Sequence, residues 1–567
     1  MTFDLRTVPL SRYGSYLCFS WLPARPESDE GLYLRTVHAG GTVRDRLARI
    51  ELVREGVSVP FTIEAMPTLL RLRAEPGLAE ICFATPTTLR LRTQGVGLRL
   101  NAPPGDYVHI FGAGEDRWQL TCFPSINLML SPLSGSAWQV DAPFREDRCC
   151  RIWADLKPPP GEQAAEGAIT EFASTWLPEP AGDSFEACLA GVERDFQRWL
   201  ARTLPLPEEF AAARELAAYI NWSAVVSPLG LLKRPAMFMS KNWMLNVWSW
   251  DHCFNALALA AGDPDLAWDQ FLVMFDQQDA SGALPDSIND RRIVWNFCKP
   301  PIHGWTLLKL LQQPALSTPA RLLEVYEPLR RWTEWWLNYR DWDGDGIPQY
   351  HHGNDSGWDN ATPFEAGLPL EAPDLSAFLV LQMEALAEVA TRLGRRSDAQ
   401  LWEQRGAQLL ARLLDHLWRG DRFVALRSGD HAGPAAGDSL FLYLPLLLGR
   451  RLPERVRTAL IAGLLRPGRF LTEHGLATES PQSPLYVPDG YWRGPIWAPS
   501  TMLLVDGLAA CGELDAARDI ARRFCRMAAR SGMAENYNAL TGAGLRDRAY
   551  TWTSSVFLLL GSEYGAS

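Results

Sequence analysis

The sequence predicts a mainly α-helical protein in which an antiparallel β-sandwich domain, residues 1–175, precedes a helical domain, residues 176–567. Three observations lead to this prediction. The chain has 567 residues, more than one hydrophobic core usually covers. Short alternating apolar runs fill about the first 170 residues, whereas apolar residues recur at helical spacing after residue 184.

The N-terminal runs include "ARIELVREGVSVP" and "TLRLRTQGVGLRL", in which apolar and polar residues alternate. Turn residues separate these runs at spacings of about 8 to 12 residues, which is typical of an antiparallel sandwich with one solvated face on each sheet. The proline-rich segments 157–167 and 177–183 are expected to lead out of this domain.

The helical part contains about twelve or thirteen segments such as "LSAFLVLQMEALAEVATRLG", with apolar residues at i, i+3, i+4 and i+7. Their connections are alternately short and long, and no fixed repeat is present. We therefore expect a closed ring of helical hairpins, with the long loops gathered over one mouth.

Composition and motifs exclude several classes of function. A net charge of −11 disfavours a nucleic-acid partner. The longest apolar run, 439–449, is too short to span a bilayer and predicts a buried helix, and no secretory signal is visible. The ten cysteines show no CxxC spacing, which favours reduced thiols in a cytoplasmic protein, and the excess of Arg over Lys favours a bacterial source. Nucleophile-elbow, dinucleotide, P-loop and HExxH motifs are missing from the sequence.

The most informative residues are tryptophans and carboxylates in the long loops. Of 23 Trp, many fall at predicted helix–loop junctions: Trp243, Trp248, Trp250, Trp295, Trp305, Trp358, Trp492, Trp497 and Trp552. Exposed or half-exposed rings beside carboxylates suit carbohydrate, whose C–H faces stack on aromatic rings. Paired carboxylates are also the equipment of glycoside hydrolysis, in which one acts as an acid and the other activates water.

Six segments carry a family resemblance. They are "WSWDHCFNALALA" (248–260), "DQQDASGALPDS" (276–287), "KPPIHGW" (299–305), "DWDGDGIPQYHHGNDSGWDNAT" (341–362), "YWRGPIWAPSTMLLVDGL" (491–508) and "AENYNALTGAGLRDRAYTWTSSVFLLL" (534–560). In this order they resemble glycoside hydrolase family 63, which with the related family 37 trehalases comprises inverting α-glycosidases on an (α/α)6 toroid. The resemblance implies hydrolysis of a small α-glucoside, a disaccharide or a glucosyl- or mannosylglycerate-like compound. It also implies that Asp359 is the general acid and Glu535 the general base.

The resemblance implies further substrate-binding residues: Trp250, Asp251, Gln278, Asp279, His303, Asp355, Trp358, Trp492, Arg493, Tyr537 and Trp552. Within this set, Arg493 is expected in the sugar pocket and Trp358 is expected to raise the pKa of the acid by burying it. Asp355 is expected to support Asp359, by binding sugar hydroxyls or through like charge. One departure from the family pattern is Lys299, which replaces a glutamine and would hold an anionic aglycone if it faced the cleft.

The turn "DWDGDG" spaces Asp341, Asp343 and Asp345 as the first half of an EF-hand loop does, but its twelfth position is His352 and not Glu. A structural Ca²⁺ is one interpretation of this turn, and a tight polar turn is the other. No cofactor is expected to be required, and the oligomeric state is left open.

Two alternative functions stay open at this point. A sugar epimerase or a phosphorylase could be built on a similar toroid, and His303, His351 and His352 are the loop histidines available to an epimerase. A non-catalytic carbohydrate-binding protein is the third interpretation.

Overall fold

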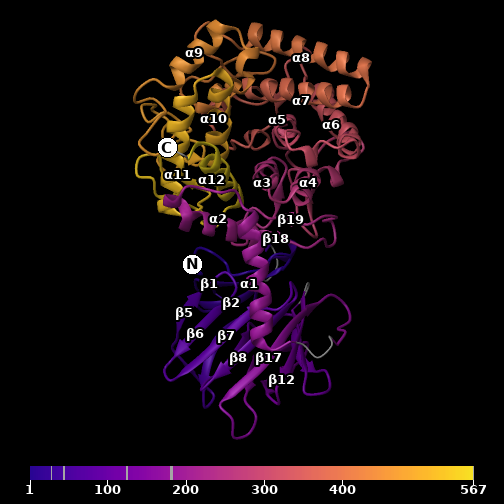
Figure 1. Cartoon of the computed structure of the whole chain (residues 1–567), viewed down its shortest axis with the longest axis vertical. Coiled ribbons are helices and arrows are strands. Elements are labelled where there is room, and N and C mark those ends of the chain that lie inside the picture. The colour runs from indigo at the N-terminus through magenta and orange to yellow at the C-terminus, as the bar shows by residue number, and fades with distance from the viewer. Residues whose placement is uncertain (27, 42–44, 123–125, 179–182, 566–567) are drawn as a thin grey trace.

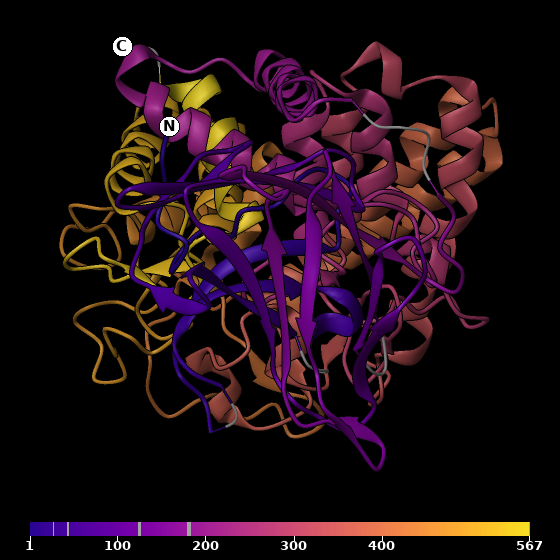
Figure 2. The same ribbon diagram turned by 90° about the horizontal axis from the view of Figure 1, so that it is seen from below.

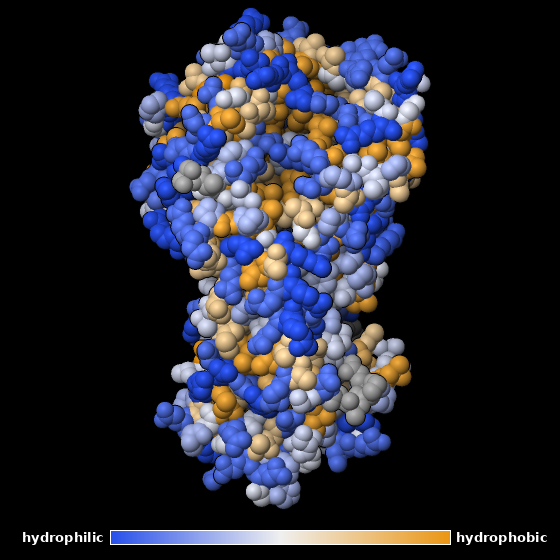
Figure 3. Space-filling model, in the orientation of Figure 1, coloured by the Kyte–Doolittle hydropathy of each residue, from blue (hydrophilic) through white to orange (hydrophobic). Residues whose placement is uncertain are grey.

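The computed structural model describes the chain except for residues 27, 42–44, 123–125, 179–182 and 566–567. It forms two lobes, one of strands and one mainly of helices, and the outline narrows between them (Figures 1 and 3). Seen from below in Figure 2, the strands lie in front of the helices. Hydrophilic and apolar side chains are interspersed over the face shown in Figure 3. No helix in the described part of the chain is both long and apolar enough to cross a membrane.

The strand lobe contains two large antiparallel sheets and a two-stranded one formed by β14 (Phe144–Arg145) and β15 (Arg148–Cys149). The first has the order β1-β2-β3-β9-β16-β13, with β4 paired to β3, and the second has the order β10-β11-β12-β17-β8-β7-β6-β5. The strands of the first sheet are β1 (Leu17–Leu22), β2 (Gly31–Thr36), β3 (Arg46–Arg54), β4 (Val57–Val59), β9 (Gly97–Ala102), β13 (Ala137–Asp141) and β16 (Ile152–Lys157). Those of the second are β5 (Thr62–Ala65), β6 (Leu70–Ala74), β7 (Gly77–Phe83), β8 (Thr88–Gln94), β10 (Val108–Gly112), β11 (Trp118–Cys122), β12 (Ile126–Leu133) and β17 (Ala164–Phe172).

The alternation predicted for these runs has a structural consequence. Leu98 and Leu100 of β9 and Leu89 and Leu91 of β8 are buried in one apolar cluster to which both sheets contribute. Successive strand residues point to opposite faces, so these leucines, which stand at every second position, all reach the cluster.

The proline-rich segment 157–167 does not lead out of the strand lobe. It connects β16 of one sheet to β17 of the other, and Glu162 N–H donates to the carbonyl of Pro159 (3.0 Å) in the turn between them. The second such segment, 177–183, falls largely outside the described residues. The first helix, α1 (Phe185–Arg202), follows it and packs against β7 and β8.

Several of the remaining helices form a closed series of contacts. Their bounds are α2 (Ala211–Ala224), α3 (Asp251–Leu259), α4 (Pro264–Leu272), α5 (His303–Leu310), α6 (Pro319–Tyr339), α7 (Pro373–Arg392), α8 (Arg396–His416), α9 (Glu454–Leu464), α10 (Ala498–Cys511), α11 (Leu514–Ser531) and α12 (Thr551–Tyr564). The predicted buried helix forms instead as the 3₁₀ segment η7 (Leu440–Arg451), which contains Pro445. Contacts run from α3 to α5, α7, η7, α10 and α12, and from α12 back to α3.

Sequence patterning separates the members of this series from the helices packed on them. Almost every residue of α7 and α12 is buried, as expected of helices that are covered all round. By contrast, α8 and α11 bury one face, and they pack against α7 and against α10 and α12 respectively.

Three short sheets hold the long loops between helices. They are formed by β20 (Val247–Trp248), β21 (Ser287–Ile288) and β22 (Ile293–Val294), by β23 (Gln349–Tyr350), β24 (Leu370–Glu371) and β25 (Leu426–Arg427), and by β26 (Ile496–Trp497), β27 (Asn536–Tyr537) and β28 (Gly544–Leu545). Each pairs segments that are distant in the sequence, and each lies next to residues of the predicted site.

A buried polar contact joins the two lobes. Arg35 of β2 donates to the carbonyls of Lys241 (3.2 Å) and Asn242 (3.0 Å), which belong to the helical lobe. In return, Lys241 Nζ donates to the carbonyl of Ser15 (2.6 Å), and burial lowers its pKa to about 7.

Candidate active site

The loop that carries Asp359 is fixed against the aromatic core. It runs from β23 through the 3₁₀ turn η5 (Gly353–Ser356) to Gly357, whose φ of 72° lies in the left-handed region. A Cβ at Gly357 would lie 2.5 Å from the ring of Trp250, so glycine is required for this close approach. The loop therefore reaches Asp359 with little freedom to move away from Trp250.

Asn360 joins this loop to residues 490–493. Its side chain accepts a hydrogen bond from Trp492 N–H (3.0 Å) and donates one to the carbonyl of Gly490 (3.0 Å). Its own carbonyl accepts from Nε of Arg493 (2.7 Å). The segment containing Tyr491 is thus held beside Asp359.

Tyr491 links this segment to Glu535. Its hydroxyl donates a hydrogen bond to Oε1 of Glu535 (3.1 Å), and its ring packs edge-on against Trp497 at 4.8 Å. Burial raises the pKa of Tyr491, and the carboxylates of Glu535, Asp359 and Asp251 raise it further. All three carboxylates therefore lie within electrostatic range of one phenol.

Glu535 is 5% exposed and lies in the short loop that follows α11. Burial raises its pKa to about 7, with Asp547 adding to the effect and the Tyr491 hydroxyl opposing it. The backbone N–H of Glu535 donates to the carbonyl of Asp547 (2.7 Å), and Asp547 accepts from Nδ2 of Asn242 (3.2 Å). Because Asn242 also donates to the carbonyl of Thr7 (2.6 Å), the N-terminal lobe is connected to the Glu535 loop by hydrogen bonds.

Lys299 faces the carboxylates and not the solvent. Its ammonium group is buried, lies 3.1 Å from Asp286 and donates to the carbonyl of Asn354 (2.7 Å). Burial disfavours its charge, but Asp286, Asp359 and Asp251 outweigh this and raise its pKa.

Asp359 and Asp251 share this environment. Burial raises the pKa of Asp359, Lys299 opposes the rise and Asp286 adds to it. Asp251, the first residue of α3 and 3% exposed, has a pKa raised well above its usual range by burial, again opposed by Lys299. Burial thus shifts both carboxyl groups toward their neutral form, and the positive charge of Lys299 limits that shift.

The tryptophans beside these carboxylates form a packed cluster. Trp492 stacks on Trp497 with ring centres 4.0 Å apart, and Trp358 lies 4.6 Å from Trp492. Trp250 meets Trp552 edge-on at 5.7 Å. Trp250, Trp358, Trp492 and Trp552 are each at most 3% exposed, so they are not the half-exposed rings expected from the sequence. Among described residues, the buried Nε1 of Trp552 has no hydrogen-bond acceptor, which suits a ligand oxygen.

Two predicted residues have their polar atoms occupied by other parts of the protein. Asp355 accepts hydrogen bonds from Cys298 N–H (3.1 Å), His351 N–H (3.0 Å) and Arg340 (2.8 Å). The like charge that raises the pKa of Asp359 comes from Asp286 instead. Arg493 forms an ion pair with Glu365 (2.7 Å) besides its bond to Asn360.

The described contacts of four others also lie elsewhere. Gln278 donates to the carbonyls of Gly282 and Pro328, and Asp279 caps the turn to Ala283. His303 is buried with Nε2 3.2 Å from Nε2 of His252 and its ring against Phe275. The Tyr537 hydroxyl donates to the carbonyl of Gly532 (2.6 Å). Substrate contacts for these residues stay predictions.

Sequence reasoning missed Tyr491, Asn360 and Asp286 as members of the group. Each lies inside a segment already singled out, next to a named residue or, for Asp286, in "LPDS". Tyr491 bonds to Glu535, 44 positions away, and the side chain of Asn360 bonds to Trp492, 132 positions away. Asp286 pairs with Lys299 on another loop. No local pattern reports such pairings.

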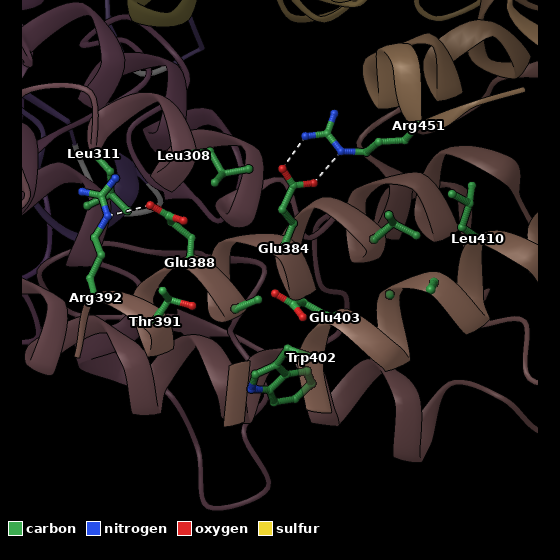
Figure 4. A pocket seen from close by; sticks show the side chains of 14 residues that line it. Leu308, Leu311, Glu384, Glu388, Thr391, Arg392, Trp402, Glu403, Leu410 and Arg451 are labelled. Carbon is green, nitrogen blue, oxygen red and sulfur yellow. Dashed lines mark hydrogen bonds and ion pairs between the residues drawn. The ribbon is translucent and has the colours of Figure 1, made fainter. Parts of the chain in front are cut away.

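A hollow of about 410 Å³ lies elsewhere on the helical lobe, between α5, α7 and α8 (Figure 4). Its walls carry the ion pairs Arg451–Glu384 and Arg392–Glu388, and Trp402 lies at its base. It contains none of the predicted site residues, so it is not the candidate active site.

The acidic turn does not provide a calcium shell of the EF-hand kind. One oxygen from each of Asp341, Asp343 and Asp345 lies within 4.8 Å of the others. However, both oxygens of Asp341 accept from N–H groups of the turn, at Gly344 (3.0 Å) and Gly346 (3.1 Å). Calcium takes six to eight oxygen ligands, whereas the side chains next to Asp345 are the imidazoles of His416 and His431 together with the Glu371 carboxylate. The donor set therefore does not fit that ion.

Comparison with known proteins agrees with this geometry. A family model described as the mannosylglycerate hydrolase MGH1-like glycoside hydrolase domain matches residues 244–553, more than half of the chain. A mannosylglycerate hydrolase of Rubrobacter radiotolerans is 23% identical over 445 residues, which cover 62% of this chain and 97% of that protein.

Two solved structures resemble the fold. One is the GH63 mannosylglycerate hydrolase of Thermus thermophilus in complex with Tris and D-glycerate. Its TM-score is 0.52 at 19% identity, covering 61% of this chain and 99% of that one. The other is a bacterial glucoamylase complexed with acarbose, with a TM-score of 0.62 at 12% identity, covering 99% of this chain and 94% of that one.

Loops that hold buried carboxylates around Tyr491, together with these matches, define the protein as a glycoside hydrolase. The resemblance to glycoside hydrolase family 63 is confirmed. The chain belongs to the mannosylglycerate hydrolase MGH1-like family of glycoside hydrolases.

Proposed function

We propose that the protein is an inverting α-glycosidase that hydrolyses a small α-glycoside, with Asp359 as general acid and Glu535 as general base. The observation that supports this most is the position of Tyr491, whose hydroxyl binds Glu535 and whose pKa is raised by Glu535, Asp359 and Asp251 together. In an inverting enzyme the two carboxyl groups are about 6.5–9.5 Å apart, which leaves room for a water molecule.

The roles follow from the two environments. Burial raises the pKa of Asp359, which is the direction that favours a carboxyl group able to donate a proton to the leaving oxygen. Glu535 ionises at about pH 7 and receives a hydrogen bond from Tyr491, which stabilises its charged form. The ionised Glu535 removes a proton from water as the water attacks the anomeric carbon and the glycosidic bond breaks.

We further propose that the architecture is an (α/α)6 toroid, residues 176–567, preceded by a β-sandwich, residues 1–175. The contacts that lead from α3 through α5, α7, η7, α10 and α12 back to α3 support a closed inner ring. The short sheets gather the loops of Asp251, Asp359 and Glu535, in keeping with one mouth of such a ring.

The substrate class is proposed from the relatives and from the charges near the site. The relatives named above are mannosylglycerate hydrolases, and glycerate is an anion. Lys299 is committed to Asp286, so it is not a free cation for an aglycone carboxylate. Arg546 lies 5.0 Å from the ring of Tyr491, and its ion pair with Asp489 (2.9 Å) is solvent-exposed, unlike the buried pair of Lys299. We therefore assign the role to Arg546. A glucosyl- or mannosylglycerate is therefore the preferred substrate, ahead of a neutral disaccharide.

Product analysis tests the reaction. Purified protein is incubated with glucosylglycerate, mannosylglycerate and a panel of neutral α-linked disaccharides, and the first-formed sugar anomer is followed by NMR. We expect the β-anomer from an α-linked substrate. An α-anomer first would contradict inversion, and sugar phosphate formed only with added phosphate would identify a phosphorylase. Two of the three histidines considered for an epimerase are poor proton donors, because burial lowers the pKa of His303 well below its usual range and that of His351 to about 4.

Arg546→Met tests the aglycone assignment separately. We expect the KM for the glycosylglycerates to rise about tenfold or more, because one charged hydrogen bond is lost. The KM for neutral disaccharides should change little. Equal effects on both substrate types would remove Arg546 from that role without affecting the hydrolase proposal.

A further inference from the structure

Four side chains of the types that ligate metals converge at one point outside the candidate active site. Asp345 ends the acidic turn, Glu371 lies on β24, His416 is the last residue of α8, and His431 follows β25. Their ligand atoms all lie within 4.8 Å of one another. Four separate segments of the chain thus bring two carboxylates and two imidazoles together.

The spacing of these atoms resembles a tetrahedral ligand shell. His416 Nε2 is 3.3 Å from Asp345 Oδ2, and His431 Nε2 is 3.8 Å from both Asp345 Oδ2 and Glu371 Oε1. Bonds of about 2.0–2.2 Å from a central ion to four ligands place neighbouring ligand atoms about 3.3–3.6 Å apart. One pair is closer: His416 Nε2 and Glu371 Oε2 are 2.6 Å apart and would separate by about 1 Å or less on binding an ion.

Unsatisfied oxygen atoms give independent support. Oε1 of Glu371 and Oδ2 of Asp345 are buried, and neither has a hydrogen-bond partner among the described residues. The Glu371 side chain is 0% exposed, so water does not reach it from the surface. Buried polar atoms are normally paired, and an unpaired carboxylate oxygen facing two imidazoles is explained by a cation between them.

The donor types decide which ion fits. Calcium and magnesium take oxygen ligands, whereas imidazole nitrogen suits zinc and neighbouring transition metals. Two carboxylates carry a charge of −2, which a divalent ion balances when both imidazoles are neutral. We propose that Asp345, Glu371, His416 and His431 form a four-coordinate site for a divalent transition metal of the zinc class, and not the calcium site that the acidic turn suggests.

The position of the site indicates a structural role. Glu371 pairs with Gln349 in the β23–β24 ladder, and β23 leads directly into the loop that ends at Asp359. An ion that ties β24 to the acidic turn, to the end of α8 and to the loop after β25 would hold the base of this loop. The ion would therefore stabilise the folded protein, because its four ligands come from segments that are far apart in the sequence and meet only after folding.

Metal content and unfolding test the proposal. Full-length protein without an affinity tag is stripped with a chelator and dialysed, and Zn²⁺, Ca²⁺ or Mg²⁺ is added in separate samples. We expect one Zn²⁺ retained per chain by elemental analysis, a higher Tm with Zn²⁺, and neither effect with Ca²⁺ or Mg²⁺. Co²⁺ should give the intense visible absorption of a four-coordinate site.

Variants locate the ion. His431→Asn suits the left-handed φ of 53° at this position, and we expect it to weaken Zn²⁺ binding at least about tenfold while leaving the far-UV spectrum unchanged. His109→Asn, on β10 in the other lobe, is the matched control and should bind as the parent does. Unchanged Zn²⁺ affinity in His431→Asn, preference for Ca²⁺, or no retained metal in the parent protein would each overturn the proposal. The parent measurement stands even if the variant does not fold.

Discussion

The hydroxyl of Tyr491 donates a hydrogen bond of 3.1 Å to Oε1 of Glu535, and the segment that carries Tyr491 is joined by Asn360 to the loop of Asp359. One phenol thus connects the two carboxylates to which we assign the chemistry. The arrangement stabilises the charged form of Glu535, whose burial would otherwise favour the neutral form.

Removing either proposed catalytic carboxyl should lower turnover. Asp359→Asn and Glu535→Gln should each reduce kcat by about 10²–10⁴-fold, the usual contribution of general acid–base catalysis. Tm should change little, because each amide keeps the shape of the side chain. With a glycosyl fluoride, whose leaving group needs no proton, Asp359→Asn should recover much of its rate while Glu535→Gln should not.

The control is Asp265→Asn. The Asp265 side chain lies on α4 and is 92% exposed, so this variant should keep the parent rate. Near-normal kcat in Asp359→Asn or Glu535→Gln would remove that residue from its role.

The pH profile should report the ionisation of Glu535. Its pKa is raised to about 7, and a base must be ionised, so kcat/KM should decrease as pH falls below about 7. Tyr491→Phe removes a hydrogen bond to the ionised form, so the acidic limb should move to higher pH. Tyr486→Phe removes a buried hydroxyl on the same segment that has no partner among described residues, and its profile should match the parent. An unmoved limb in Tyr491→Phe would contradict the coupling.

Lys299 should be required for stability as well as for the charge of the site. Lys299→Met leaves Asp286 buried without its cation, and breaking a buried ion pair in this way costs about 3–5 kcal/mol. Urea unfolding followed by tryptophan fluorescence measures the change. Lys233→Met, on the surface, should cost far less. A small loss in Lys299→Met would show that the carboxylates take up protons to compensate.

The contact between the lobes should depend on pH through His38. Its imidazole lies 2.7 Å from Glu171 and 2.8 Å from Asp290 of the helical lobe. Burial lowers its pKa, but the two carboxylates outweigh this and raise it. Because the pKa of His38 is higher in the folded protein than in the unfolded chain, protonated His38 stabilises the folded state. This contribution is complete below the unfolded-state pKa of about 6.5 and is lost as the pH rises through the folded-state pKa.

We therefore expect the difference in Tm between the parent and His38→Gln to be largest below about pH 6.5 and to shrink as pH increases. His109→Gln serves as the control and should show no such trend. A difference in Tm that is constant across pH would contradict the assignment to His38.

Much of the helical lobe was predictable from local pattern. The 3.6-residue spacing of apolar residues locates α1, α7 and α8 because a helix must bury one stripe or its whole surface. Failures occurred where local and global preferences differ: the run 439–449, predicted as a buried helix, falls mostly in the 3₁₀ segment η7, which contains Pro445, and segment 157–167 turns between two sheets. The aromatic residues were recognised, but their burial was not, because exposure depends on what packs against each ring.

The sequence by itself determined the class of protein, since ordered motifs such as "SGWD" and "ENYN" identify the family without any knowledge of contacts. Only the tertiary structure decided which side chains meet: Tyr491 with Glu535, Lys299 with Asp286, and Glu371 with His416 and His431. The physical reason is that periodicity and turn chemistry act over a few residues. Charges and hydrogen bonds in a buried site depend on packing between segments that are far apart along the chain.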